Sequence, residues 1–144
     1  MQAVIFDLDD TLFTAEQTLH DDVQNLLAIL RRLGIKVGAL TSGDHRMLVR
    51  LDEAGIGKHF DHVISSEHTD EPKAPDAVSQ LLRVLRVDPQ DTAMVSFARA
   101  DIALGKHAGL GKTIRVAHGS VTESERHGAD HLVENIPTIL DVLE

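Results

Sequence analysis

Short apolar stretches alternate along the chain with longer segments whose apolar residues recur every three or four positions. Residues 3–6 (Ala-Val-Ile-Phe) are apolar without interruption, which is typical of a strand buried on both faces of a parallel sheet. Residues 21–33 carry apolar side chains at helical spacing, and Gly34 follows as a helix stop. The same alternation continues to the end of the chain. It predicts further strands at 35–40, 62–65, 92–97, 113–116 and 131–133 and further helices at 44–54, 76–85, 101–107 and 136–143.

Strands that alternate with helices predict right-handed βαβ units and a parallel sheet covered on both faces. We therefore expect an α/β fold, a three-layer Rossmann-like domain with a central parallel sheet of about five or six strands. The length of 144 residues fits one domain, and neither a repeat nor a linker interrupts it, so we expect a single domain over residues 1–144. Ligands of such sheets bind beyond the carboxyl ends of the strands, where the candidate chemistry is therefore sought.

Composition excludes several classes of site and partner. The chain has no cysteine, which excludes disulfides and thiolate metal sites. Its net charge of −9 argues against a nucleic-acid or anionic-membrane surface, and four Phe without Trp or Tyr offer little for base stacking. No apolar run approaches a membrane span, and the first residues do not resemble a secretion signal. We expect a cytoplasmic protein without nucleic-acid or membrane partners.

Two carboxylates, Asp7 and Asp9, follow the first predicted strand in the loop Asp-Leu-Asp-Asp-Thr. Side chains two positions apart on extended chain point the same way, so both can face one site. Like charges this close need a shared proton or a cation, and Mg²⁺ suits them because it takes carboxylates together with waters and phosphate oxygens. One carboxylate can attack phosphorus while the other transfers the proton. The alternative is a simple capping turn.

The other strand ends add phosphate-binding and metal-binding candidates. Thr41 and Ser42, after the second strand, can offer hydroxyl and amide groups to phosphate, or can form an ordinary helix cap. Lys73, in the loop after the third strand, can neutralise phosphate and the attacking carboxylate, or can be a solvated surface lysine. Asp101, after the fourth strand, can be a metal ligand or only a favourable helix start.

Taken together, these strand ends resemble those of the haloacid dehalogenase superfamily of aspartyl-nucleophile phosphatases. The similarity covers roughly residues 2–140. Residues 4–12 (Val-Ile-Phe-Asp-Leu-Asp-Asp-Thr-Leu) look like the first motif of that superfamily without departure. Residues 37–41 look like its second motif, and residues 101–114 look like the helix and strand that follow its fourth motif.

The resemblance implies a phosphohydrolase that acts on a phosphomonoester through an aspartyl-phosphate, with Mg²⁺ as the cofactor. It implies that Asp7 is the nucleophile and a metal ligand, and that Asp9 is the acid and base, with its backbone carbonyl on Mg²⁺. It implies a phosphate-binding hydroxyl at Thr41, a phosphate-binding catalytic lysine at Lys73, and a metal ligand at Asp101.

Two departures from the family pattern weaken this implication. In the third motif Pro72 and Lys73 stand in swapped order. In the fourth motif Phe97 stands where the family has its principal metal-binding aspartate, so Asp101 would have to take over, directly or through a water. Loss of even an outer partner at a metal site costs about 10–100-fold in affinity or activity. The alternative interpretation of Phe97 is a core residue in a site that has lost its metal. Arg99 is either a phosphate ligand or a solvated residue at the start of a helix.

The family often carries a cap domain between its motifs, but this chain leaves no room for one. The segments from Asp7 to Thr41 and from Thr41 to Lys73 are each filled by predicted elements. The site should therefore be open, so that loops, a second subunit or a large substrate select what binds. The expected partner is a phosphorylated small molecule or an exposed phosphate on a larger substrate, and the oligomeric state is left open.

Two further functional readings compete with the phosphohydrolase. The first is a catalytically impaired relative that keeps the fold as a binding or regulatory module, as Phe97 and the displaced Lys73 would allow. The second is a two-component receiver domain, which would need an aspartate after the third strand, where residues 62–67 (His-Val-Ile-Ser-Ser-Glu) have none.

The chain has nine histidines, two of which have a spacing that could form a metal site. His127 and His131 are four positions apart, a spacing that suits a metal site on a helix. Gly128 and the strand predicted at 131–133 argue against one helix there, so we expect scattered surface histidines.

Overall fold

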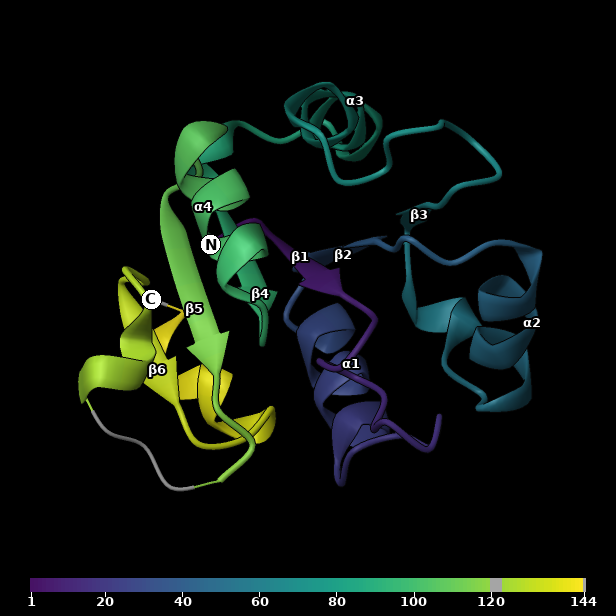
Figure 1. Ribbon diagram of the computed structural model, residues 1–144, viewed down its shortest axis with the longest axis horizontal. Helices are drawn as coiled ribbons and strands as arrows, with labels where there is room; N and C mark the ends of the chain where they lie inside the picture. Colours follow the sequence, from purple (N-terminus) through teal and green to yellow (C-terminus); the bar gives the residue numbers. More distant parts are fainter. Residues whose placement is uncertain (120–122, 144) are drawn as a thin grey trace.

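The computed structural model describes residues 1–119 and 123–143, which form one parallel six-stranded sheet with helices on both faces (Figure 1). The strand order is β3-β2-β1-β4-β5-β6. The strands are β1 (Ala3–Asp7), β2 (Lys36–Leu40), β3 (His62–Ile64), β4 (Thr92–Ser96), β5 (Lys112–Val116) and β6 (His131–Val133). The α-helices are α1 (Val23–Arg32), α2 (His45–Glu53), α3 (Pro75–Leu85) and α4 (Arg99–His107). The predicted α/β class and parallel sheet are confirmed.

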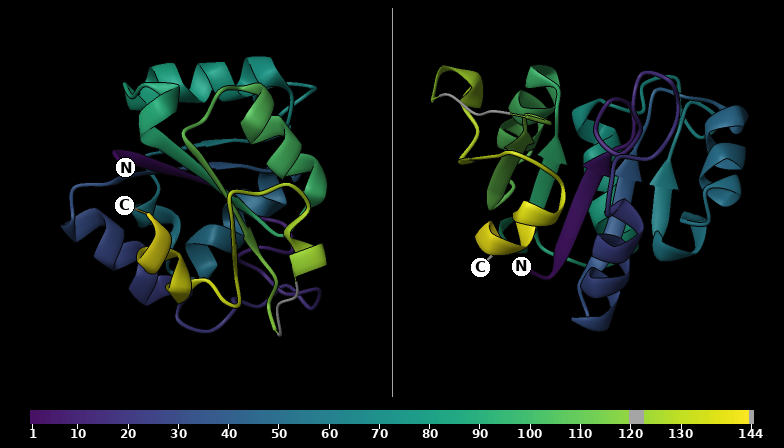
Figure 2. Two further views of the ribbon diagram at one scale, coloured as in Figure 1. Left: turned by 90° about the vertical axis from the view of Figure 1, so that its left-hand side faces the viewer. Right: turned by 90° about the horizontal axis from the view of Figure 1, so that it is seen from below.

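Each face of the sheet is covered by its own set of helices (Figure 2). Side chains alternate between the faces of a strand, so Val4 and Phe6 of β1 pack with α1 and α2, while Ala3 and Ile5 pack with α3. The C-terminal 3-10 helix, η4 (Pro137–Val142), joins α1 on the first face, and Leu104 of α4 joins α3 on the second. The two cores hold β1 rigidly in the middle of the sheet.

The helix ends follow the signals in the sequence. Gly34 ends α1 with φ of 77°, and the next amide, that of Ile35, donates to the carbonyl of Leu30. Asp44 caps α2, because its carboxylate accepts a hydrogen bond of 3.0 Å from the amide of Arg46. The helix expected at 136–143 is wrong in type, because the segment Pro137–Val142 is a 3-10 helix instead.

The parallel register brings the carboxyl ends of three strands to one edge. Asp7 is paired with Leu40 of β2, and Phe6 with Val95 of β4, so Asp7, Thr41 and Ser96 lie side by side. The connection from β1 to α1 is a single loop over residues 8–22, and no cap domain is inserted in the described parts of the chain. No helix among the described residues has the length and apolar character needed to cross a membrane.

Candidate active site

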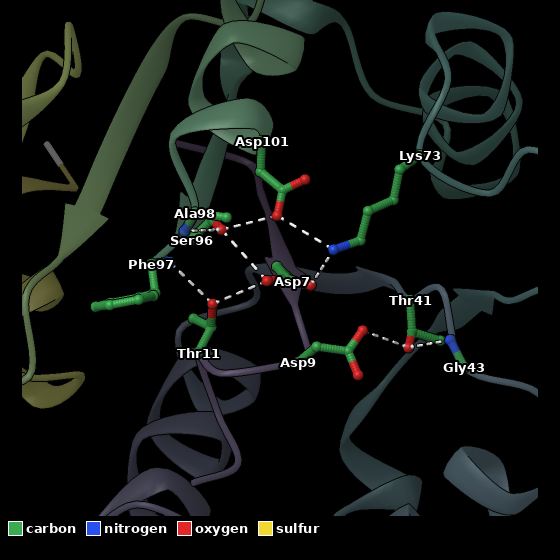
Figure 3. A network of polar contacts seen from close by, with 10 residues as sticks. All are labelled: Asp7, Asp9, Thr11, Thr41, Gly43, Lys73, Ser96, Phe97, Ala98 and Asp101. Atoms are coloured by element: carbon green, nitrogen blue, oxygen red, sulfur yellow. Dashed lines mark hydrogen bonds and ion pairs between the residues drawn. The ribbon is translucent and has the colours of Figure 1, made fainter. Parts of the chain in front are cut away.

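Asp7 is the centre of a buried polar network at the carboxyl end of β1 (Figure 3). Its side chain points into the edge formed by β1, β2 and β4, and the residue is only 2% exposed. The Lys73 ammonium donates to Oδ1 at 2.6 Å, and the Thr11 hydroxyl donates to Oδ2 at 3.1 Å. A weaker contact of 3.4 Å joins the Ser96 hydroxyl to Oδ2. A carboxylate held in this way has a fixed orientation.

Asp101 provides the second buried carboxylate of the network. It lies in the first turn of α4 rather than at its first residue, and it is 4% exposed. Its Oδ2 accepts a hydrogen bond of 2.8 Å from Ser96 and lies 3.3 Å from the Lys73 ammonium. The structure therefore brings Lys73 between Asp7 and Asp101, and the swap with Pro72 does not keep this side chain from the site.

Burial changes the proton affinity of the nucleophile candidate. Removal from water, and then the nearby Asp101, raise the pKa of Asp7 from 3.8 to about 7, while Lys73 acts in the opposite direction. Burial would lower the pKa of Lys73, but the two carboxylates outweigh this and raise it. The ammonium is therefore charged, and added positive charge beside Asp7 would favour its carboxylate form.

Asp9 faces a different direction from Asp7, toward the end of β2 (Figure 3). It is partly exposed, and its Oδ2 accepts a hydrogen bond of 3.0 Å from the Thr41 hydroxyl. That hydroxyl in turn accepts from the amide of Gly43 at 3.0 Å. Thr41, expected at the phosphate, is thus beside Asp9. Ser42 is exposed and lines an open hollow next to Asp9 instead of joining the Asp7 network.

Phe97 does not behave as the sequence led us to expect. It is 37% exposed, so the interpretation as a core residue is wrong. Its ring points away from the carboxylates (Figure 3) and lies 4.9 Å from the Arg115 guanidinium carbon and 5.8 Å from the ring centre of His118. Only its amide faces the site, where it donates to the Thr11 hydroxyl at 2.9 Å. The ring therefore supplies no oxygen, but it also does not lie between Asp7 and Asp101.

Sequence reasoning missed two members of the network. The Thr11 hydroxyl donates to Asp7 and accepts a hydrogen bond from the amide of Phe97. The Ser96 hydroxyl donates to Asp101 and accepts a hydrogen bond of 2.9 Å from the amide of Ala98. The sequence marks both positions, because Thr11 lies within the first motif and Ser96 is the last residue of β4. Neither could be assigned a partner before the strands were placed side by side.

The remaining candidates lie outside the network. Arg99 is exposed at the start of α4. His127 follows the 3-10 helix η3 (Glu123–Arg126), whereas His131 opens β6, so these two residues do not share a helix.

The donor set suits a hard divalent cation with few protein ligands. Asp7 and Asp101 converge on the same ammonium, so their oxygens can also converge on a cation. Within residues 1–119 and 123–143 there is no group of three or more His, Asp or Glu side chains that could hold a metal. Mg²⁺ commonly binds through one or two carboxylates and keeps waters and phosphate oxygens for the rest. The residues therefore fit Mg²⁺, with fewer carboxylates than a three-ligand site.

Comparison with known families identifies the chain. The model of haloacid dehalogenase-like hydrolases matches residues 13–109. The chain belongs to this family. The match begins just after the acidic loop and covers the elements from α1 to α4 that bring Thr41, Lys73 and Asp101 to the site.

Individual haloacid dehalogenase-like relatives are longer than this chain. A phosphoglycolate phosphatase of Chromobacterium violaceum is 29% identical over 130 residues, which are 88% of this chain and 57% of the relative. A pyrophosphatase PpaX of Anoxybacillus flavithermus is also 29% identical, over 93% of this chain and 62% of the relative. The chain thus spans about 57–62% of the length of these relatives.

A solved structure supports the fold. The crystal structure of a HAD phosphatase from Thermococcus onnurineus superimposes with a TM-score of 0.89, covers 99% of this chain and 98% of that one, and is 18% identical. At this identity the likeness is one of fold alone.

Proposed function

We propose that this chain is a phosphohydrolase that cleaves a phosphomonoester through an aspartyl-phosphate on Asp7. The observation that carries the proposal is the buried Asp7 carboxylate at the carboxyl end of the central strand, with the Lys73 ammonium 2.6 Å from one oxygen. The Thr11 hydroxyl orients the other oxygen. A fixed carboxylate beside a fixed cation suits attack on a phosphate whose negative charge must be neutralised.

The first half of the reaction transfers the phosphoryl group. An oxygen of Asp7 attacks phosphorus, and the bond from phosphorus to the leaving oxygen breaks. Asp9, in its protonated form, gives its proton to that oxygen, so the alcohol leaves neutral. Thr41 holds Asp9 in position through the hydrogen bond of 3.0 Å. Lys73 balances the charge on the phosphoryl oxygens.

The second half restores the enzyme. Asp9, now a carboxylate, takes a proton from a water as that water attacks phosphorus. The bond between phosphorus and the Asp7 oxygen breaks, which releases inorganic phosphate and the free Asp7 carboxylate. Asp7 and Asp101 would hold Mg²⁺, with the Asp9 carbonyl as a third ligand by family resemblance. When bound, the ion adds positive charge for the phosphate oxygens and favours the ionised form of Asp7.

The relatives support the same class of reaction. The names phosphoglycolate phosphatase and pyrophosphatase both describe cleavage of a bond between phosphorus and oxygen. We infer that residues 1–144 act as one domain on a phosphorylated small molecule or on an exposed phosphate of a larger substrate. The cytoplasmic location stays a prediction.

The test is hydrolysis of p-nitrophenyl phosphate with Mg²⁺ by the natural chain and by Asp7→Asn. The substitution keeps size and polarity but removes the nucleophile, so turnover should fall to background. Asp52→Asn makes the same change at an exposed aspartate, so it is the matched control and should retain the natural rate. Equal rates for the natural chain and Asp7→Asn would disprove the proposal.

A second candidate function is a binding or regulatory module without turnover. Phe97 removes one family carboxylate, and Lys73 already bridges the two that are left. This candidate predicts weak Mg²⁺ binding by the natural chain and tighter binding by Phe97→Asp, both measured by titration calorimetry. Tight Mg²⁺ binding by the natural chain would count against it.

A further inference from the structure

An open hollow of about 450 Å³ lies beside Asp9, between the end of β2 and α2. Asp9 and Asp44 line it together with Ser42, and Arg46 and Arg50 reach it from α2. Neither Asp7 nor Lys73 lines it. The hollow is therefore adjacent to the phosphoryl-transfer network and separate from it.

The position of the hollow matches the place where a leaving group must lie. In the proposed reaction Asp9 gives its proton to the leaving oxygen, so that oxygen must come within hydrogen-bond distance of Asp9. Asp9 faces the end of β2, while the nucleophile Asp7 faces Lys73 and Asp101 (Figure 3). The part of the substrate beyond the leaving oxygen is thus directed into the hollow.

The two arginines of the hollow differ in their partners. Arg46 is paired with Asp44, with 3.2 Å between Nη2 and Oδ2 and 3.3 Å between Nε and Oδ1. Arg50 lies one helical turn further on, where positions four apart share a face. It is partly buried, and its guanidinium makes no hydrogen bond or ion pair with any residue in the described parts of the chain. A planar set of donors without a partner fits a carboxylate or a phosphate.

We propose that Arg50, with Arg46 beside it, selects substrates whose leaving group carries a second anionic group. The substrate class is then a phosphate ester of a hydroxy acid or a compound with a second phosphate, rather than an ester of a neutral alcohol. The proposal rests on the proposed function, because the leaving group is assigned to the hollow through the role of Asp9. It adds a specificity residue that the catalytic network does not contain.

The experiment compares two esters of nearly equal size, 2-carboxyethyl phosphate and 3-hydroxypropyl phosphate, with inorganic pyrophosphate as a third substrate. The natural chain should show at least about a tenfold higher kcat/KM for 2-carboxyethyl phosphate than for the neutral ester, the size expected for one charge-assisted contact. Arg50→Gln should bring this ratio close to one. Arg83→Gln, at an exposed arginine of α3 outside the hollow, should keep the natural ratio. Pyrophosphate distinguishes the second phosphate from the carboxylate as the preferred group.

The outcomes separate the inference from the proposed function. Equal kcat/KM values for the two esters, or an Arg50→Gln variant that keeps the preference, would overturn the role of Arg50 while leaving phosphohydrolysis intact. If no ester is hydrolysed, the proposed function fails. The role of Arg50 is then tested by calorimetry, which compares the affinity for 3-phosphonopropanoate, which has a carboxylate, with the affinity for propylphosphonate, which has none. At least about tenfold tighter binding of the carboxylate compound, lost in Arg50→Gln, would support the anion site. Equal binding of the two compounds would overturn it.

Discussion

At the scale of single residues, the site depends on a lysine that two buried carboxylates share. Lys73 contacts Asp7 at 2.6 Å and Asp101 at 3.3 Å, and its ammonium is their common charged partner. Asp7 is also the residue whose proton affinity burial changes most clearly. Substitutions at Lys73 and Asp7 therefore test how the charges of this network affect activity and stability.

We expect Lys73→Met to lower kcat/KM for p-nitrophenyl phosphate by about 10²-fold or more, because a positioned charge near developing negative charge contributes about that much. Methionine keeps the length of the side chain and removes only the ammonium. The measurement is a steady-state assay with saturating Mg²⁺, and Lys58→Met is the control for loss of a lysine. A variant within about threefold of the natural chain would show that Lys73 has no catalytic charge role.

The pKa of Asp7 predicts how stability depends on pH without divalent cations. Burial and Asp101 raise this pKa from 3.8 to about 7, so the folded chain keeps a proton that the unfolded chain has released. The stabilisation is complete below about pH 4 and is lost as pH rises through about 7. Asparagine has no proton to lose, so Asp7→Asn does not lose this stabilisation as pH rises. The Tm of Asp7→Asn should therefore rise relative to the Tm of the natural chain between about pH 4 and pH 7. Thermal melts in EDTA measure it, and a difference independent of pH would contradict the raised pKa.

At the scale of elements, the hydrophobic pattern was sufficient for the strands and the four α-helices, but not for the 3-10 form of η4 or for the side chains at the ends of the strands. Uninterrupted apolar runs correctly predicted β1 and the parallel sheet, and Asp44 and Gly34 correctly marked helix ends. The direction of the Phe97 ring depends on Arg115 of β5 and on His118, which are distant in sequence and become neighbours only when β4 and β5 pair. The contact between Ser96 and Asp101 likewise needs the turn from β4 into α4.

The turn into β5 offers a test of packing between elements. Gly111 donates its amide to the carbonyl of Pro89 at 2.9 Å, and a Cβ at this position would lie 2.0 Å from the carbonyl oxygen of Gln90. We expect Gly111→Ala to lower the free energy of unfolding by about 1–3 kcal/mol, because backbone must move to relieve the overlap. Urea unfolding measures the change.

A matched substitution for this test is Gly57→Ala. A Cβ at Gly57 would overlap with the carboxylate of Asp52, which is exposed and can turn away, and would meet the backbone nitrogen of Asp52 at an ordinary contact distance of 3.6 Å. Its cost should stay within about 0.5 kcal/mol. Equal losses at Gly57 and Gly111 would mean that the contact with Gln90 is not what makes glycine necessary.

At the scale of the whole molecule, binding of a cation and stability of the fold are linked. Asp7 lies on β1 and Asp101 on α4, so a cation held by both would join the centre of the sheet to a helix on its second face. Anything that binds only the folded chain raises its stability, by about 2.7 kcal/mol when its concentration is 100 times Kd. Mg²⁺ in excess should therefore raise the Tm of the natural chain, and Asp101→Asn should reduce the rise because one of two carboxylates is lost.

The same linkage distinguishes a working metal site from an impaired one. Phe97→Asp adds a carboxylate at the position where the family resemblance implies a metal-binding aspartate, so the rise in Tm with Mg²⁺ should exceed that of the natural chain. Asp52→Asn, at an exposed aspartate, is the control for Asp101→Asn, because both lose one negative charge. It should leave the rise in Tm with Mg²⁺ unchanged. If the natural chain and Asp101→Asn respond identically to Mg²⁺, the cation does not bind between Asp7 and Asp101. Among residues 1–119 and 123–143, Lys73 would then be the only positive charge that these two carboxylates share.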